Sequence, residues 1–149
     1  ALSWCGTGED KNMTDIATAA PGTEIGRITA DRITRHMLAL YCGAFGDHNP
    51  IHVDIDFAKS AGMPDVFAHG MLSMAFLGRL VTKLAPQTVL RGFGARFTSI
   101  TQLGSEITCV AKLVERFEDG GEKRAKLELV AMDQNGDVKL MGDAVVALA

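Results

Sequence analysis

The residues best suited to chemistry lie in one short stretch of the chain. A carboxylate and an imidazole, Asp47 and His52, belong to the sequence GDHNPIH. Pro50 lacks an amide proton and biases Asn49 away from helical backbone angles, so we expect a helix end followed by an extended loop. Such a loop can turn both side chains toward one cleft. A carboxylate and an imidazole that meet at a water molecule form an acid/base pair able to add or remove that water.

A second block, AHGML, follows further along the chain and contains Gly70. An apolar helix is predicted from this block to residue 81. If the helix begins at Gly70, a free amide lies at the positive end of the helix dipole and can bind an oxyanion. Glycine also permits the close approach of a carbonyl. The alternative is that Gly70 only relieves crowding between the helix and a sheet.

Together the two blocks resemble the MaoC-like hydratases, the R-specific enoyl-CoA hydratases of the hotdog fold. The residues that carry the resemblance are Gly46 to His52, Asp54, Phe57, Ala58 and Phe67 to Leu72. It implies reversible hydration of a trans-2-enoyl-CoA to the (R)-3-hydroxyacyl-CoA, with Asp47 and His52 as the catalytic pair and Gly70 as the oxyanion hole. An acyl-carrier thioester is an equally open substrate.

The resemblance also implies a homodimer whose sheets join edge to edge, and a higher oligomer stays open. Open edges of a wrapped sheet give this prediction independent support. No cofactor is expected, since coenzyme A enters only as part of the substrate. Two competing functions stay open: a hotdog thioesterase using the same oxyanion site, and a non-catalytic accessory protein that binds acyl thioesters.

Each candidate residue also has a structural interpretation. An Asp beside a turn commonly binds backbone amides, and a His after Pro-Ile is often a structural donor. We expect Asn49 to brace the loop and His69 to be a packed or hydrogen-bonded neighbour, and both are candidate substrate contacts together with Phe67 and Met71. No metal site is expected, because Pro50 argues against the helix that would align His48 with His52.

Helical periodicity marks the segments that would position these residues. A stripe at three- and four-residue intervals predicts a helix, with Thr29 or Asp31 as its N-cap and Gly46 as its end; its members are Ile33, Met37, Leu40, Tyr41, Ala44 and Phe45. Asp54 or Asp56 can cap a short second helix. The helix from residue 70 is apolar in almost every direction, so we expect it to be enclosed.

Alternating patterns predict strands through the rest of the chain. They cover residues 23–29, 93–103, 107–114, 124–131 and 138–148, with turns at 118–121 and 133–136. The last four read as an antiparallel meander. An apolar helix followed by such strands predicts an α+β hotdog fold, in which an antiparallel sheet wraps a central helix.

Composition limits the remaining choices. The 149 residues, 47% hydrophobic and 22% charged, predict one globular domain at 23–149, preceded by a mobile arm at 1–22 in which Met13 is a candidate start. A net charge of −3 without a basic cluster gives no reason to expect nucleic acid, and no apolar run is long enough for a membrane span. Three unpaired cysteines and no secretory signal favour a reducing, cytoplasmic location.

Overall fold

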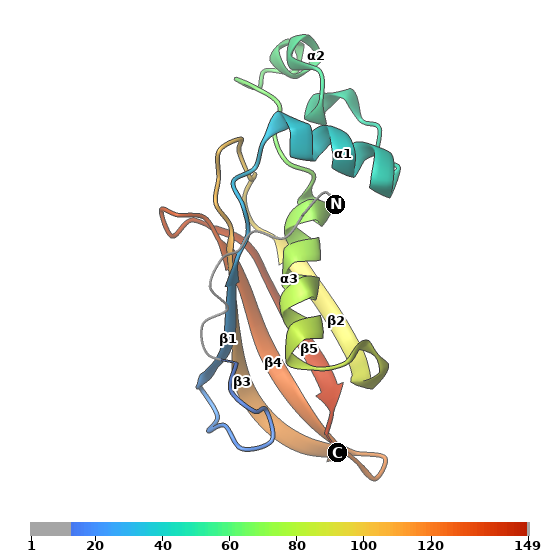
Figure 1. Ribbon diagram of the computed structural model, residues 1–149, viewed down its shortest axis with the longest axis vertical. Helices are drawn as coiled ribbons and strands as arrows, with labels where there is room; N and C mark the ends of the chain where they lie inside the picture. The colour runs from blue at the N-terminus through green and yellow to red at the C-terminus, as the bar shows by residue number, and fades with distance from the viewer. Residues whose placement is uncertain (1–12, 149) are drawn as a thin grey trace.

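A five-stranded antiparallel sheet curves around one long helix (Figure 1). The computed structural model describes residues 13–148. Across the sheet the strands run in the order β1 (Glu24–Thr29), β3 (Thr108–Asp119), β4 (Glu122–Met132), β5 (Val138–Ala147) and β2 (Leu90–Phe97). The helix is α3 (Gly70–Leu84), and a short turn of 3-10 helix at Gln87–Val89 connects it to β2. The predicted α+β architecture is confirmed.

The sheet buries one face of each central strand against α3. In β4 the fully buried side chains of Ala125, Leu127, Leu129 and Ala131 alternate with more exposed residues, as the period of two requires. Apolar burial on this scale is the dominant favourable contribution to folding. The core therefore lies between the concave face of the sheet and α3.

Helix α3 is less enclosed than its composition predicted. Leu72, Leu77 and Leu80 are at most 2% exposed, but Met71 is 39% exposed and Ala75 also faces outward. A single curved sheet covers only one side of a helix. The prediction of a fully enclosed helix is therefore wrong for the isolated chain.

The order of the strands also differs from a simple meander. Strands β3, β4 and β5 do follow one another, but β2 pairs with β5 at one edge and β1 pairs with β3 at the other. Strand β2 ends at Phe97, before the predicted limit at Leu103. The chain then leaves the sheet, so residues 98–103 form an irregular segment near the start of α3.

Two short helices lie beyond one end of the sheet (Figure 1). Helix α1 (Arg35–Phe45) is capped by the side chain of Thr34, not by Thr29 or Asp31, and ends at Gly46, which has a left-handed φ of 81°. The cap differs because Ile33 binds Ser105 through its backbone and so lies outside the helix. Helix α2 (Ile55–Ser60) is capped by Asp54, one of its two predicted caps.

The segment before β1 is packed where it is described. Residues 1–12 of the predicted arm lie outside the described residues, but Ile16 and Ala19 are each only 6% exposed. Their carbonyl oxygens accept hydrogen bonds from the guanidinium of Arg116. Residues 13–22 are therefore part of the folded domain. No helix between residues 13 and 148 has the length and apolar character needed to cross a membrane.

Candidate active site

The loop after α1 is shaped by its own side chains. Asp47 accepts a hydrogen bond from the amide of Asn49 at 3.2 Å, and the Asn49 side chain accepts one from Ile51 at 3.2 Å. A single 3-10 turn, Pro50–His52, follows. Asx turns of this kind arise because short Asp and Asn side chains bind backbone amides two residues ahead. Asn49 therefore braces the loop, as predicted.

His52 is held in one tautomer. Its side chain is buried, and Nδ1 lies 2.8 Å from the carbonyl oxygen of Phe67, which can only accept a hydrogen bond. Nδ1 therefore carries the proton, and in the neutral ring Nε2 has a free lone pair. An imidazole oriented in this way is ready to accept a proton at Nε2.

His69 stacks directly on His52. The two ring centroids are 3.9 Å apart, and Nε2 of His69 donates a 3.2 Å hydrogen bond to the backbone carbonyl of Asp47. His69 is 1% exposed, and its Nδ1 has no hydrogen-bond partner among residues 13–148. Burial lowers the pKa of His69, and the neighbouring His52 lowers this pKa further. A neutral His69 thus ties the Asp47 loop to the start of α3, consistent with the bonded neighbour that the sequence predicts.

The three side chains converge on one point. Asp47, His52 and His69 each bring a carboxylate oxygen or a ring nitrogen within 4.8 Å of the others. The sequence-predicted pair is thus brought together, although its members come from the loop and from the 3-10 turn after it. A spacing of this size leaves room for one water molecule between hydrogen-bonding groups.

The same cluster is poorly arranged for a metal ion. The planes of the two imidazoles differ by only 29°, and their lone pairs lie in those planes. Nearly parallel rings cannot both direct a lone pair at one ion about 2 Å away. The arrangement suits proton transfer better than metal binding.

Gly70 begins α3 next to this cluster. His69 precedes it as the N-cap residue and provides no side-chain cap, so the first turn of the helix keeps amides for another acceptor. A Cβ atom added at Gly70 would lie 2.9 Å from Cε1 of Phe97. The Phe97 ring therefore lies tightly against Gly70, and this ring would have to shift to admit an alanine, while glycine leaves room for a carbonyl that approaches the helix.

A cavity of about 320 Å³ opens beside Gly70. Its walls come from the segment before α3, from α3, from the end of β2 and the irregular segment after it, and from β5. They are formed by Phe67, Ala68, Gly70, Ser73, Phe97, Thr98, Ser99, Ile100, Thr101 and Leu140. Phe67 both lines the cavity and anchors His52. The acid/base cluster and the cavity thus meet at the segment that starts α3.

The candidate substrate contacts are distributed unevenly. Of the four residues predicted, Phe67 lines the cavity and His69 belongs to the acid/base cluster. Asn49 braces the loop and Met71 is exposed, and neither lines this cavity. Sequence reasoning missed Phe97 and residues 98–101. Their pattern only indicated a strand, and no local signal shows that the chain leaves the sheet there.

The MaoC like domain family matches residues 16–134. This chain belongs to the MaoC-like domain family. The match includes the Asp47 loop, α3 and strands β1 to β4, so it covers the whole candidate site except β5.

Curated relatives support the same family. The MaoC-like chain is 30% identical over 110 residues to 3-hydroxyacyl-thioester dehydratase Z of Mycobacterium tuberculosis, covering 70% of this chain and 72% of the relative. It is also 30% identical over 104 residues to enoyl-CoA hydratase ChsH3 of the same organism. That second match covers 68% of this chain but only 34% of ChsH3.

Solved structures confirm the hotdog fold of this MaoC-like chain. R-hydratase PhaJ1 from Pseudomonas aeruginosa matches with a TM-score of 0.77 and 25% identity, covering 91% of this chain and 86% of that one. The (R)-hydratase from A. caviae matches with a TM-score of 0.76 and 25% identity, covering 89% and 98%. The relatives and solved structures named here are hydratases and a dehydratase.

Proposed function

We propose that this protein adds water reversibly to a trans-2-enoyl thioester of coenzyme A, forming the (R)-3-hydroxyacyl thioester. The observation that carries the proposal is the convergence of Asp47, His52 and His69 within 4.8 Å at the start of α3. The relatives named as a hydratase and a dehydratase support the reaction class. The proposed reaction needs no cofactor, because coenzyme A enters as part of the substrate.

In the proposed reaction, water lies between the Asp47 carboxylate and Nε2 of His52. Its oxygen bonds to the β-carbon of the substrate, and one of its protons passes to the pair. A proton is then returned to the α-carbon, so the reaction is balanced without an added acid or base. The Phe67 carbonyl, which accepts from Nδ1 of His52, stabilises the imidazolium whenever His52 holds the extra proton. The assignment of base and acid within the pair stays open.

The thioester oxygen would lie against the first turn of α3. Negative charge develops on this oxygen as water attacks the β-carbon, and an uncapped helix start supplies amides for it. The cavity beside Gly70 would receive the substrate atoms that flank the thioester. Its size of about 320 Å³ lies at the lower end of the range for small-molecule pockets.

We also propose that two copies pair along β2. This strand is an edge of the sheet, and the exposed apolar side chains of Phe97, Ile100 and Met141 lie on it or beside it. Pairing would cover both the open edge and these side chains. The solved ChsH1-ChsH2 complex of Mycobacterium tuberculosis, similar in fold at 16% identity, contains two different chains. Analytical ultracentrifugation of the purified chain distinguishes a homodimer from a monomer that needs a different partner.

A single assay separates the candidate reactions. Purified protein is mixed with crotonyl-CoA while the enoyl absorbance and free thiol are followed in parallel. Loss of absorbance without thiol release is expected. Thiol release would instead indicate a thioesterase, and neither change across several acyl chain lengths would indicate an accessory binding protein.

A further inference from the structure

A buried ammonium group, that of Lys139, lies outside the acid/base cluster, near the start of strand β5. Lys139 is 4% exposed, and its Nζ lies 2.5 Å from Asp137 and 3.3 Å from Asp133. Burial by itself raises the pKa of Asp133, but the amides of Asn135 and Asp137 and the ammonium of Lys139 outweigh it and hold this pKa below its ordinary value. We call Asp133, Asp137 and Lys139 the lysine cluster.

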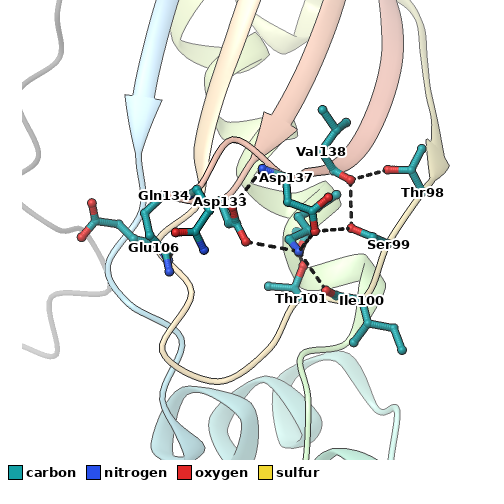
Figure 2. A network of polar contacts seen from close by, with 12 residues as sticks. Thr98, Ser99, Ile100, Thr101, Glu106, Asp133, Gln134, Asp137 and Val138 are labelled. Carbon is teal, nitrogen blue, oxygen red and sulfur yellow. Dashed lines mark hydrogen bonds and ion pairs between the residues drawn. The ribbon is translucent and has the colours of Figure 1, made fainter.

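The lysine cluster binds the segment that forms one wall of the cavity. Residues 98–101, which we call the wall segment, all line that cavity. Nζ of Lys139 donates a 3.1 Å hydrogen bond to the carbonyl oxygen of Ile100, and Ser99 donates to Asp137 at 3.2 Å. Figure 2 shows Asp137, Ser99 and the Ile100 carbonyl facing one another between the β4–β5 turn and the wall segment.

The side-chain hydrogen bonds of the wall segment begin where the backbone ladder between β2 and β5 stops. Strand β2 ends at Phe97, and the last backbone bond of this edge runs from Thr98 to the carbonyl of Lys139. Beyond that point the wall segment is held to β5 by the ammonium and by two hydroxyls. Thr98 donates to the Val138 carbonyl, and the single hydroxyl proton of Ser99 is shared between this carbonyl at 2.9 Å and Asp137 at 3.2 Å. An irregular segment needs such partners for its backbone polar groups.

The wall segment in turn binds the segment that orients His52. The carbonyl oxygen of Thr101 accepts a 2.9 Å hydrogen bond from Ala68, and the hydroxyls of Thr101 and Ser73 lie 3.1 Å apart in the interior. The residue before Ala68 is Phe67, whose carbonyl accepts from His52. A continuous path of contacts therefore runs from the ammonium through the wall segment to the imidazole.

We propose that Lys139 is a positioning residue: its buried ammonium fixes the wall segment and, through Thr101 and Ala68, the carbonyl that orients His52. The inference deepens the proposed hydratase function and rests on it for its catalytic consequence. Its structural part, the coupling of Lys139 to residues 66–70, does not depend on which reaction the site performs.

Lys139→Met tests the proposal, because methionine keeps an unbranched apolar stem and removes the charge and the donors. Glu122→Gln is the matched control, since it disrupts an ion cluster at the opposite end of the same sheet. Both variants and the unchanged protein are compared by kcat and KM on crotonyl-CoA. They are also compared by hydrogen exchange in peptides covering residues 66–70 and 98–101.

For Lys139→Met we expect kcat to fall by about 10- to 100-fold, the loss typical of a small misplacement of catalytic groups. Amide exchange should rise about tenfold at 98–101 and at 66–70 while β1 keeps its protection. Glu122→Gln should match the unchanged protein in both kinetics and hydrogen exchange. A loss of thermal stability with normal kcat, or with normal exchange at 66–70, would overturn the positioning role.

If the unchanged protein turns over no enoyl thioester, the proposed function has failed. Hydrogen exchange at residues 66–70 then decides by itself whether Lys139 is coupled to the Phe67 carbonyl that holds His52. Should Lys139→Met not fold, Asp137→Asn weakens the same ammonium contact at a side chain that is 58% exposed. Faster exchange at both segments in this variant supports the proposal. Unchanged exchange at both overturns it.

Discussion

The two ends of the sheet carry similar groups of charges in different surroundings. At the end near α1, the lysine cluster places one cation beside two carboxylates, and the Lys139 side chain is 5% exposed. At the opposite end, Glu122 lies between Arg91 and Arg124, with side chains about one quarter to one third exposed. We call the second group the far cluster. Figure 1 shows these ends as the β4–β5 turn and the β3–β4 turn.

The two clusters differ in their exposure to water and in the segments that they hold together. Water competes for exposed ion pairs, so their contribution to stability is small. Loss of one partner from a buried pair leaves an uncompensated charge, which is far more costly. The far cluster joins β2 to β4, and both strands are already held in the sheet by ladder bonds to β5, whereas the lysine cluster holds a segment that has left the sheet. Similar charges therefore matter more where regular hydrogen bonding ends.

The largest effects are expected at the acid/base pair. Asp47→Asn and His52→Ala should each lower kcat by about 100-fold or more, because each removes a group that holds or moves a proton. Circular dichroism should show the fold intact, since neither side chain belongs to the apolar core between the sheet and α3. Glu122→Gln serves as the control. Activity retained by either site variant would remove that residue from the mechanism.

A pair of glycines on one helix tests the space beside the cavity. Gly70→Ala places a Cβ 2.9 Å from the Phe97 ring, so we expect about a tenfold loss of kcat/KM from displaced substrate and ring. Gly78→Ala, further along α3, meets the Phe93 ring at an ordinary 3.7 Å. It should keep normal kinetics and gain slightly in stability, because Ala is favoured within helices. Equal behaviour of the two variants would count against the assignment of Gly70.

His69 should make the stability of the folded protein depend on pH. Its folded pKa lies below the ordinary value of 6.5, so the unfolded chain takes up this proton first as pH falls. The contribution of neutral His69 is therefore complete above about pH 6.5 and declines below it. Thermal unfolding should show a smaller loss between about pH 7.5 and about pH 5.5 for His69→Gln than for the unchanged protein. His36→Gln, at an exposed position, is the control and should leave the full loss in place.

The smallest effect is expected at the far cluster. Hydrogen bonds from Arg91 and Arg124 lower the pKa of Glu122 from 4.5 to about 2. Because the folded pKa is the lower one, the cluster stabilises the protein above pH 4.5 and loses that contribution as pH falls toward 2. At neutral pH, Glu122→Gln should therefore melt slightly earlier than the unchanged protein, with the difference reduced by salt. An altered kcat in this variant would break the contrast between the two ends.

Much of the candidate site could be predicted because its parts are local. Asp47, Asn49 and Pro50 form their turn through bonds two residues apart, and Gly46 ends its helix through one backbone angle. Their residue types determine these features wherever the loop lies. The roles of Asp47 and His52 in turnover stay predictions, although the structure brings both to one point.

Long-range contacts account for what was missed. Lys139 gave no signal, because its burial depends on Asp133 and on Ile100, which is 39 residues away in the chain. Thr34 caps α1 because Ile33 is bound to Ser105. The pairing of β2 with β5 was also missed. An alternating pattern shows which face of a strand is buried, but it does not show which strand lies beside it. Each outcome depends on partners that a local pattern does not specify.

The sequence by itself determined the strand and helix periods, the turn that carries Asp47, and the resemblance to a hydratase family, since each depends on residues close together in the chain. Only the tertiary structure decided that His69 stacks on His52, that Phe97 lies over Gly70, and that a buried ammonium holds the cavity wall. The physical reason is that burial and pairing are properties of segments brought together by folding.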